Sequence, residues 1–220
     1  NLAIDITFDL VLKEELLRAE LISAPLTILI LLFVFGTVVS ASLPALSGIY
    51  TVIAAVGIIH GLTYIVDDLT VYAVNIVSLL GIGLSVDYSL FIVNRFREEL
   101  GRGHDKRTAI AMTSATAGRA ILFSGLTVVA GLTGMLFFEN TGLPSLGWGG
   151  ICATLVALTS SVILLPSILA ILGDRINSGR VPLGLSTEVA DDGFWSDLAK
   201  RVMSKPLSFL VPSVLILLVA

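Results

Sequence analysis

The stretch from Pro25 to Val66 contains no Asp, Glu, Lys or Arg. At about 1.5 Å per residue, one helix over this stretch would be roughly twice as long as the ~30 Å hydrocarbon core of a bilayer. The chain must therefore cross a membrane twice here and fold back between the two spans. We place the turn at 40–44, because Pro44 cannot continue the first helix but suits the first turn of the next one.

The rest of the sequence is similarly apolar. Of the 220 residues, 55% are hydrophobic and 14% are charged, whereas roughly a quarter of the residues of an average soluble domain are charged. We predict an all-α fold: a polytopic transmembrane helical bundle with five complete spans in residues 20–172 and the start of a sixth. The expected spans are 21–40, 44–66, 71–94, 108–138 and 145–172, followed by an incomplete one at 206–220. The incomplete last span and the N-terminal Asn favour a fragment of a larger chain.

Lysine and arginine are concentrated in two of the polar connections. Six lie in 95–119 and five in 175–205. The positive-inside rule then predicts that 95–107 and 173–205 are cytoplasmic, and that 1–19, 67–70 and 139–144 are external. Within the linker 173–205, the amphipathic pattern of FWSDLAKRVM suits either a helix at the inner surface of the membrane or a helix packed on a further domain.

One carboxylate interrupts the third expected span, in GIGLSVDYSLFIVNRFREEL (residues 81–100). Asp87 comes seven residues before Asn94, which places it about 10 Å inside the hydrocarbon boundary. A charge at that depth costs at least a few kcal/mol, so intramembrane carboxylates usually face a bundle interior or a water cavity and mark proton or ion paths. The alternative is a packing role, in which Asp87 pairs with a Lys or Arg of another helix. No Lys or Arg lies deep within the five expected spans.

The neighbours of Asp87 favour a proton relay. Tyr88 supplies a hydroxyl that can donate or accept a hydrogen bond. Small residues at four-residue spacing would allow another helix to approach closely; they are Gly81, Ser85 and Ser89, with Gly83 one turn before Asp87.

Three further side chains are candidates to support the relay or its gate. Ser124 and Thr127, on the next span, can extend a proton path, although hydroxyls in helices more often bond to their own backbone. Phe91 lies one turn beyond Asp87. It can seal the relay from cytoplasmic water, or it can be an ordinary packing residue.

At the inner end of the same span, two arginines follow the apolar run. Arg95 and Arg97 are expected to anchor the helix at anionic headgroups and to satisfy its last carbonyl groups, with gating as the alternative. Glu98 and Glu99 are spaced to pair with Arg95 or Arg102 along the helix.

The sequence lacks the motifs of common catalytic classes. It contains no Gly-rich phosphate loop, no His-Glu-x-x-His and no Ser-His-Asp pattern. We therefore expect no enzyme activity, no metal site and no cofactor, with protons as the coupling ion. The lone Cys152 lies in an apolar span, where it is expected to pack as a small hydrophobic residue.

Taken together, these motifs closely resemble the MmpL branch of the resistance-nodulation-division (RND) transporters. The resemblance is carried by GIGLSVDYSLFIVNRFREELGRG, by TAIAMTSATAGRAILFSGLTVVAGL after it and by AELISAPLTILILLFVFGTVVSASLP before it. It runs from about Arg18 to the end of the chain and includes LLPSILAILGDRI and RVMSKPL. The Asp-Tyr pair in a Gly-rich helix, followed by Arg-Phe-Arg-Glu-Glu and then Ala-Thr-Ala-Gly-Arg, is a specific combination.

The resemblance implies a twelve-helix protein of the bacterial inner membrane, built from two similar halves with a large external porter domain in each. This chain would hold helices two to six and the start of seven, and 1–19 would be the tail of the first porter domain with a stalk helix. Asp87 and Tyr88 would form a proton relay with a similar pair on helix ten, in the second transmembrane half. Proton flow through the relay would drive export of lipids or other hydrophobic cargo.

Two other functions stay open on the sequence alone. RND-like proteins also assist protein secretion, with the same proton chemistry. A sterol-sensing or scaffold membrane protein of related architecture would not transport, and Asp87 would then be a packing residue. The charge at position 87 would matter to turnover in the first case and not in the second.

Overall fold

The computed structural model of the protein describes residues 18, 21–22, 25–66, 69–138, 142–179 and 194–219. Every regular element in these residues is a helix, which confirms the predicted all-α fold. The chain divides into two units, Asn1–Leu185 and Ser186–Ala220. Nearly all of the expected stalk, the middle of the linker and the acidic turn residues at 67–68 and 139–141 lie outside the described residues.

In the described part of the first unit, four helical spans are long and apolar enough to cross a membrane. They are α2 (Val38–Leu62), α3 (Val71–Gly101), Lys106–Phe137 and Leu143–Asn177. The third span comprises α4 (Lys106–Thr113), the π-helical segment η1 (Ser114–Gly118), α5 (Arg119–Thr133) and the 3-10 segment η2 (Gly134–Phe137). The fourth comprises α6 (Leu143–Thr159), the π-helical segment η3 (Ser160–Leu164), α7 (Leu165–Leu172) and η4 (Gly173–Asn177). A shorter apolar helix, Pro25–Phe35, precedes α2.

The turn between the first two spans lies earlier than the sequence predicts. The first helix ends at Phe35 and α2 begins at Val38, so Pro44 lies inside α2. Gly36 turns the chain with φ 63°, a left-handed conformation that glycine adopts because it has no Cβ. The Val38 N–H then donates to the carbonyl of Gly179 (3.1 Å). The prediction of a turn at 40–44 was wrong because the glycine, and not the proline, supplies the conformation that breaks the helix.

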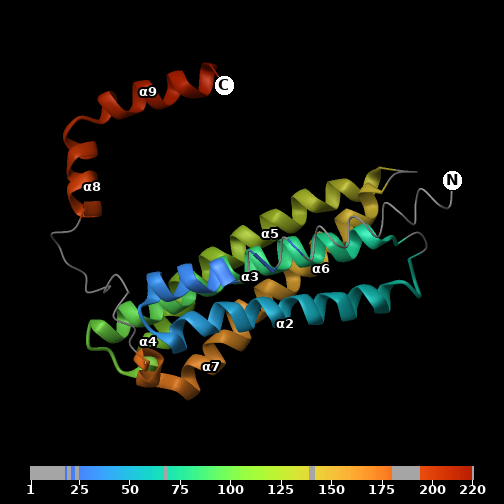
Figure 1. Ribbon diagram of the computed structural model, residues 1–220, viewed down its shortest axis with the longest axis horizontal. Coiled ribbons are helices and arrows are strands. Elements are labelled where there is room, and N and C mark those ends of the chain that lie inside the picture. The colour runs from blue at the N-terminus through green and yellow to red at the C-terminus, as the bar shows by residue number, and fades with distance from the viewer. Residues whose placement is uncertain are drawn as a thin grey trace. The chain divides into compact units, whose positions relative to one another are not determined.

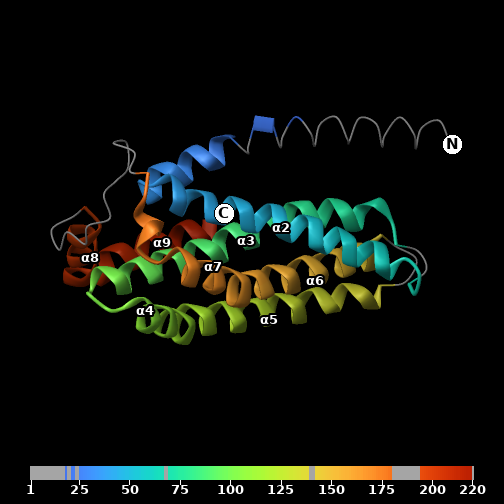
Figure 2. The same cartoon turned by 90° about the horizontal axis from the view of Figure 1, so that it is seen from below.

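Helices α3 and α6 form the centre of the bundle. α3 contacts α2 and α6, and α6 also contacts α2 and α5. Figures 1 and 2 show these helices side by side along most of their length. Their closest approach is at Gly149, where an added Cβ would fall on the carbonyl oxygen of Ala73. Farther along the same contact, a Cβ on Gly81 would lie 3.7 Å from the Cβ of Ala153.

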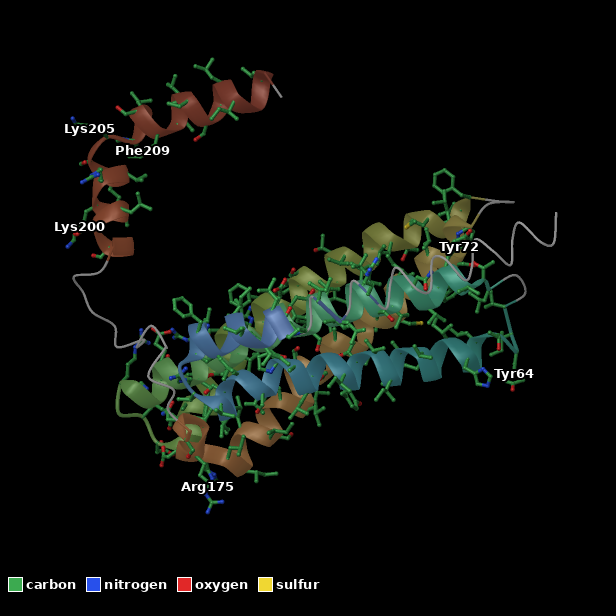
Figure 3. All side chains as sticks on the ribbon, in the orientation of Figure 1. Tyr64, Tyr72, Arg175, Lys200, Lys205 and Phe209 are labelled. Atoms are coloured by element: carbon green, nitrogen blue, oxygen red, sulfur yellow. The ribbon has the colours of Figure 1, made fainter. Side chains whose placement is uncertain are left out.

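The two ends of the bundle differ in their side chains. Figure 3 places Tyr64 and Tyr72 at one end and Arg175 at the other. We call the end that holds Arg175 and the turn from α3 to α4 the inner end, because the sequence predicts it to be cytoplasmic.

The second unit contains helices α8 (Phe194–Ser204) and α9 (Pro206–Val219), which contact each other. α8 coincides with the segment predicted to be a short amphipathic helix. α9 is a helix of apolar residues, as expected for the beginning of a further span. The labelled side chains Lys200, Lys205 and Phe209 belong to this unit in Figure 3. The location of α8 at a membrane surface stays a prediction.

Substitution of Gly149 tests the close approach of α3 and α6. Gly149→Ala is expected to destabilise the protein by about 1–3 kcal/mol, the usual cost of overpacking, because the new methyl group meets the backbone of Ala73. The matched control is Gly131→Ala in α5, where an added Cβ has no described atom within 4 Å. Thermal unfolding of the purified protein in detergent would measure both. Equal stability of the two variants would contradict the packing described here.

Candidate proton-relay site

Helix α3 places Asp87 and Tyr88 on different faces, because adjacent residues of a helix point about 100° apart. Tyr88 is 6% exposed and belongs to the hydrophobic core. Asp87, midway along α3, is exposed on the surface of the described bundle. The expectation that Asp87 faces the interior of these helices is therefore wrong. Packing against α2 and α6 buries the face of α3 that holds Gly81 and Ser85, and this turns Asp87 outward.

Asp87 shares its face with Gly83 and Phe91, one turn to either side; we call these three residues the relay face. A Cβ added to Gly83 would have no described atom within 4 Å, so the predicted packing role of Gly83 is not seen among the described residues. Phe91 is 66% exposed and does not seal the described bundle. The glycine leaves room for another helix to come close to Asp87.

The hydroxyl of Tyr88 points into the bundle, toward α5. Ser124 is the side chain that interacts with it, although the geometry is not that of a regular hydrogen bond and the Tyr88 Oη has no partner within hydrogen-bonding criteria. Thr127, the second hydroxyl predicted on this span, donates instead to the Phe123 carbonyl of its own helix (2.9 Å). The structure therefore brings Ser124 to the relay and leaves Thr127 bonded to its own backbone.

The opposite face of α3 holds the predicted small residues. Gly81 is buried, and an added Cβ would lie 3.4 Å from the methyl group of Thr51 and close to Ala153. The Thr51 hydroxyl donates to Ser85 Oγ (3.1 Å), so α2 and α3 are joined by a buried hydrogen bond. Gly81 thus has the packing role that the sequence predicts, and Gly83 does not have it here.

At the inner end, a fully buried carboxylate holds the turn from α3 to α4. Glu99 pairs with Arg95 (2.6 Å), Arg102 (2.9 Å) and His104 (2.8 Å). The His104 N–H also donates to the Glu99 carbonyl (3.3 Å), across a turn in which Gly103 has φ 86°. The pairing of Glu98 and Glu99 with Arg95 and Arg102 confirms the sequence-based expectation. The sequence did not single out His104, although its place just after a glycine at the helix end was a usable signal.

The start of α4 is fixed by its own cap. The Asp105 carboxylate accepts from the Arg107 N–H (3.2 Å). A hydrogen bond from the Thr108 side chain holds the pKa of Asp105 below its ordinary value. Helix α4 therefore begins directly after the turn that Glu99 stabilises.

Arg97 joins three segments that are distant in the sequence. It donates to the Phe35 carbonyl (2.9 Å) and to Asn177 Oδ1 (3.0 Å), and its guanidinium lies 5.9 Å from the centre of the Phe35 ring. Thr37 and Ser40 donate to the Ile176 carbonyl in the same region. The predicted contact of Arg95 and Arg97 with headgroups stays a prediction, because both side chains also bind within the protein. These partners could not be read from the sequence, since they lie 62 and 80 residues away.

The described residues offer no candidate metal site. No three His, Cys, Asp or Glu side chains in the described ranges are grouped so as to hold a metal ion. Cys152 is buried in a hydrophobic cluster with Ala153 and Val156, in agreement with its predicted packing role.

A helical bundle with several apolar spans, crossed by one exposed intramembrane carboxylate, defines this chain as part of a multi-pass membrane protein. The model of the MMPL family matches residues 7–209. The chain belongs to the MMPL family, as the sequence motifs indicate.

Curated relatives with names that state a function cover almost the whole chain. The "Trehalose monomycolate exporter MmpL3" of Mycobacterium tuberculosis (strain ATCC 25618 / H37Rv) is 34% identical over 91% of this chain and 24% of the relative. The "Mycolic acid-containing lipids exporter MmpL11" of Mycolicibacterium smegmatis is 35% identical over 94% of this chain and 22% of the relative. The "Putative membrane protein SCO6666" of Streptomyces coelicolor is 36% identical over 94% and 28%. The chain thus spans about a quarter of the length of these relatives.

Replacement of Glu99 tests the buried ion pairs at the inner end. Glu99→Gln is expected to destabilise the turn from α3 to α4 by about 3 kcal/mol, because it leaves buried arginine nitrogens without their carboxylate. Glu98→Gln is the matched control, since Glu98 pairs with the same two arginines but is 36% exposed and is expected to cost less than about 1 kcal/mol. Amide hydrogen exchange over 99–106 would report the difference. Equal exchange in the two variants would refute the role given to Glu99.

Proposed function

We propose that this chain is the relay-bearing part of a proton-driven exporter of lipids or other hydrophobic molecules. The observation that carries the proposal is the position of Asp87. This carboxylate lies midway along an apolar spanning helix, it is exposed, and none of the ion pairs in the described residues includes it. Membership of the MMPL family and the exporter names of the relatives support the same function.

The relay face is suited to a carboxylate that alternates between two environments. When another helix covers Asp87, water leaves the carboxylate and its charged form becomes less favourable. When water reaches the face again, the proton is released. Gly83 permits close contact with the covering helix, which we assign to the second transmembrane half and its own Asp-Tyr pair. Tyr88 and Ser124 lie on the other side of α3 and orient the hydroxyls that accept or return the proton.

The energy available from such a relay is sufficient for transport. One proton that crosses a potential of ~100 mV releases about 2.3 kcal/mol before any pH gradient is counted. A ligand or proton can shift a conformational equilibrium by as much as its binding differs between two states. We infer that protons are the only coupling ion needed, that no cofactor or enzyme activity is involved, and that the protein resides in the bacterial inner membrane with Arg95 and Arg97 on the cytoplasmic side.

The substitution Asp87→Asn keeps the shape of the side chain and removes its charge. In the full-length protein it is expected to lower proton-driven export by about 100-fold or more, as for a lost proton-transfer group. Export of a labelled hydrophobic cargo and growth complementation would measure the effect, with membrane expression compared with the wild type. Asp174→Asn makes the same chemical change at an exposed inner-end residue and is expected to be silent. Undiminished export by Asp87→Asn would favour a scaffold protein in which Asp87 is structural.

The two hydroxyls of α5 make a matched pair for a second test. Ser124→Ala is expected to slow export about tenfold, because it removes the side chain that interacts with Tyr88. Thr127→Val should leave the rate unchanged, because the Thr127 hydroxyl is bonded to its own helix. The assay is the same initial rate of export, at equal expression. A larger effect at 127 than at 124 would exclude the arrangement proposed here.

A further inference from the structure

Most helix hydroxyls in the described chain satisfy themselves on their own backbone. Each donates to the carbonyl four residues earlier, at distances from 2.6 to 2.9 Å. These residues are Thr116, Thr127, Thr133, Thr154, Thr159, Ser167 and Ser213. This bond is the usual solution for a hydroxyl in an apolar environment.

A group of buried hydroxyls near the relay does not follow that pattern. Ser89 and Ser161 are completely buried, Ser160 is 1% exposed and Tyr88 is 6% exposed. The oxygen of each side chain has no hydrogen-bond partner in the protein. Native interiors leave very few polar atoms in this condition, so each one requires an explanation.

Three contacts between helices place these hydroxyls at one depth. Gly81 of α3 lies against Ala153 of α6, and eight residues farther along each chain are Ser89 and Ser161. Because the two helices run in the same direction, Ser89 and Ser161 lie at the same level. Gly125 of α5 lies against Leu158, two residues before Ser160. Next to Gly125 is Ser124, which interacts with Tyr88.

The local backbone explains why two of the serines lack an internal partner. Ser160 and Ser161 belong to the π-helical segment η3, in which the ordinary helical register is interrupted. The other π-helical segment, η1, contacts η3, and both contact α3. π-helical turns are often found at functional sites. Two of them meet beside the helix that carries Asp87.

We propose that ordered water molecules bind in the bundle between Tyr88, Ser89, Ser160 and Ser161. A buried water requires two to four polar partners, and these four hydroxyls supply them. Hydroxyls alone, without a carboxylate, favour water over a cation, and no metal-binding group was found in the described ranges. The use of this water by transport rests on the proposed function. It would connect to the Tyr88 hydroxyl from the buried side of α3, while Asp87 is reached from the relay face.

A high-resolution structure of the full-length protein provides the direct test. The expected result is density for at least one ordered water within hydrogen-bonding distance of two of the four hydroxyls. The inference is overturned if the hydroxyls are turned onto backbone carbonyls with no water among them. This outcome does not depend on whether the protein exports anything, so it separates the water site from the proposed function.

Variants test whether transport uses the water. In Ser160→Ala/Ser161→Ala we expect the density to disappear and the initial export rate to fall about tenfold. The matched control is Thr154→Val, which removes a hydroxyl that is equally buried but bonded to the Gly150 carbonyl (2.7 Å). Ser89→Ala, on α3, repeats the test if the double variant folds poorly. Loss of the density with an unchanged export rate would overturn the transport role of the water, even if Asp87→Asn abolishes export.

Discussion

The close approach of α3 and α6 determines the rest of the arrangement. Gly149 lies against the backbone of Ala73, and Gly81 fits between Thr51 and Ala153, so α3 can pack in only one rotational setting. That setting buries Tyr88 and leaves Asp87 on the surface. The exposure of the carboxylate is therefore a consequence of how small residues are distributed around α3, and it does not require any contact made by Asp87 itself.

The inner end fixes α3 along its axis. Glu99 joins the last turn of α3 to His104, and Arg97 joins it to Phe35 and Asn177. With both ends of the relay helix held, a change of protonation at Asp87 would act mainly on whatever covers the relay face. The buried hydroxyls lie on the other side of the same rigid helix. In this account α3 separates two proton-accessible regions, one at the relay face and one within the bundle.

The sequence was sufficient for the fold class, the starts of the later spans and the pairing of Glu98 and Glu99 with nearby arginines, because each follows from local spacing and hydropathy. It failed at Gly36, where a single positive φ decides the turn and Pro44 gives a stronger but misleading signal. It also placed Asp87 inside the bundle, because periodicity gives the relative phase of residues and not the direction in which neighbouring helices lie. The partners of Arg97 are long-range contacts and leave no local signal.

The central claim is that Asp87 takes up and releases a proton. Infrared difference spectroscopy of the full-length protein in membranes would measure this directly, with Asp87→Asn used to assign the carboxyl band. The account predicts a band of a protonated carboxylic acid that grows as the pH is lowered and is missing in the variant. A carboxylate at position 87 whose spectrum does not change with pH over the range in which the protein works would contradict it.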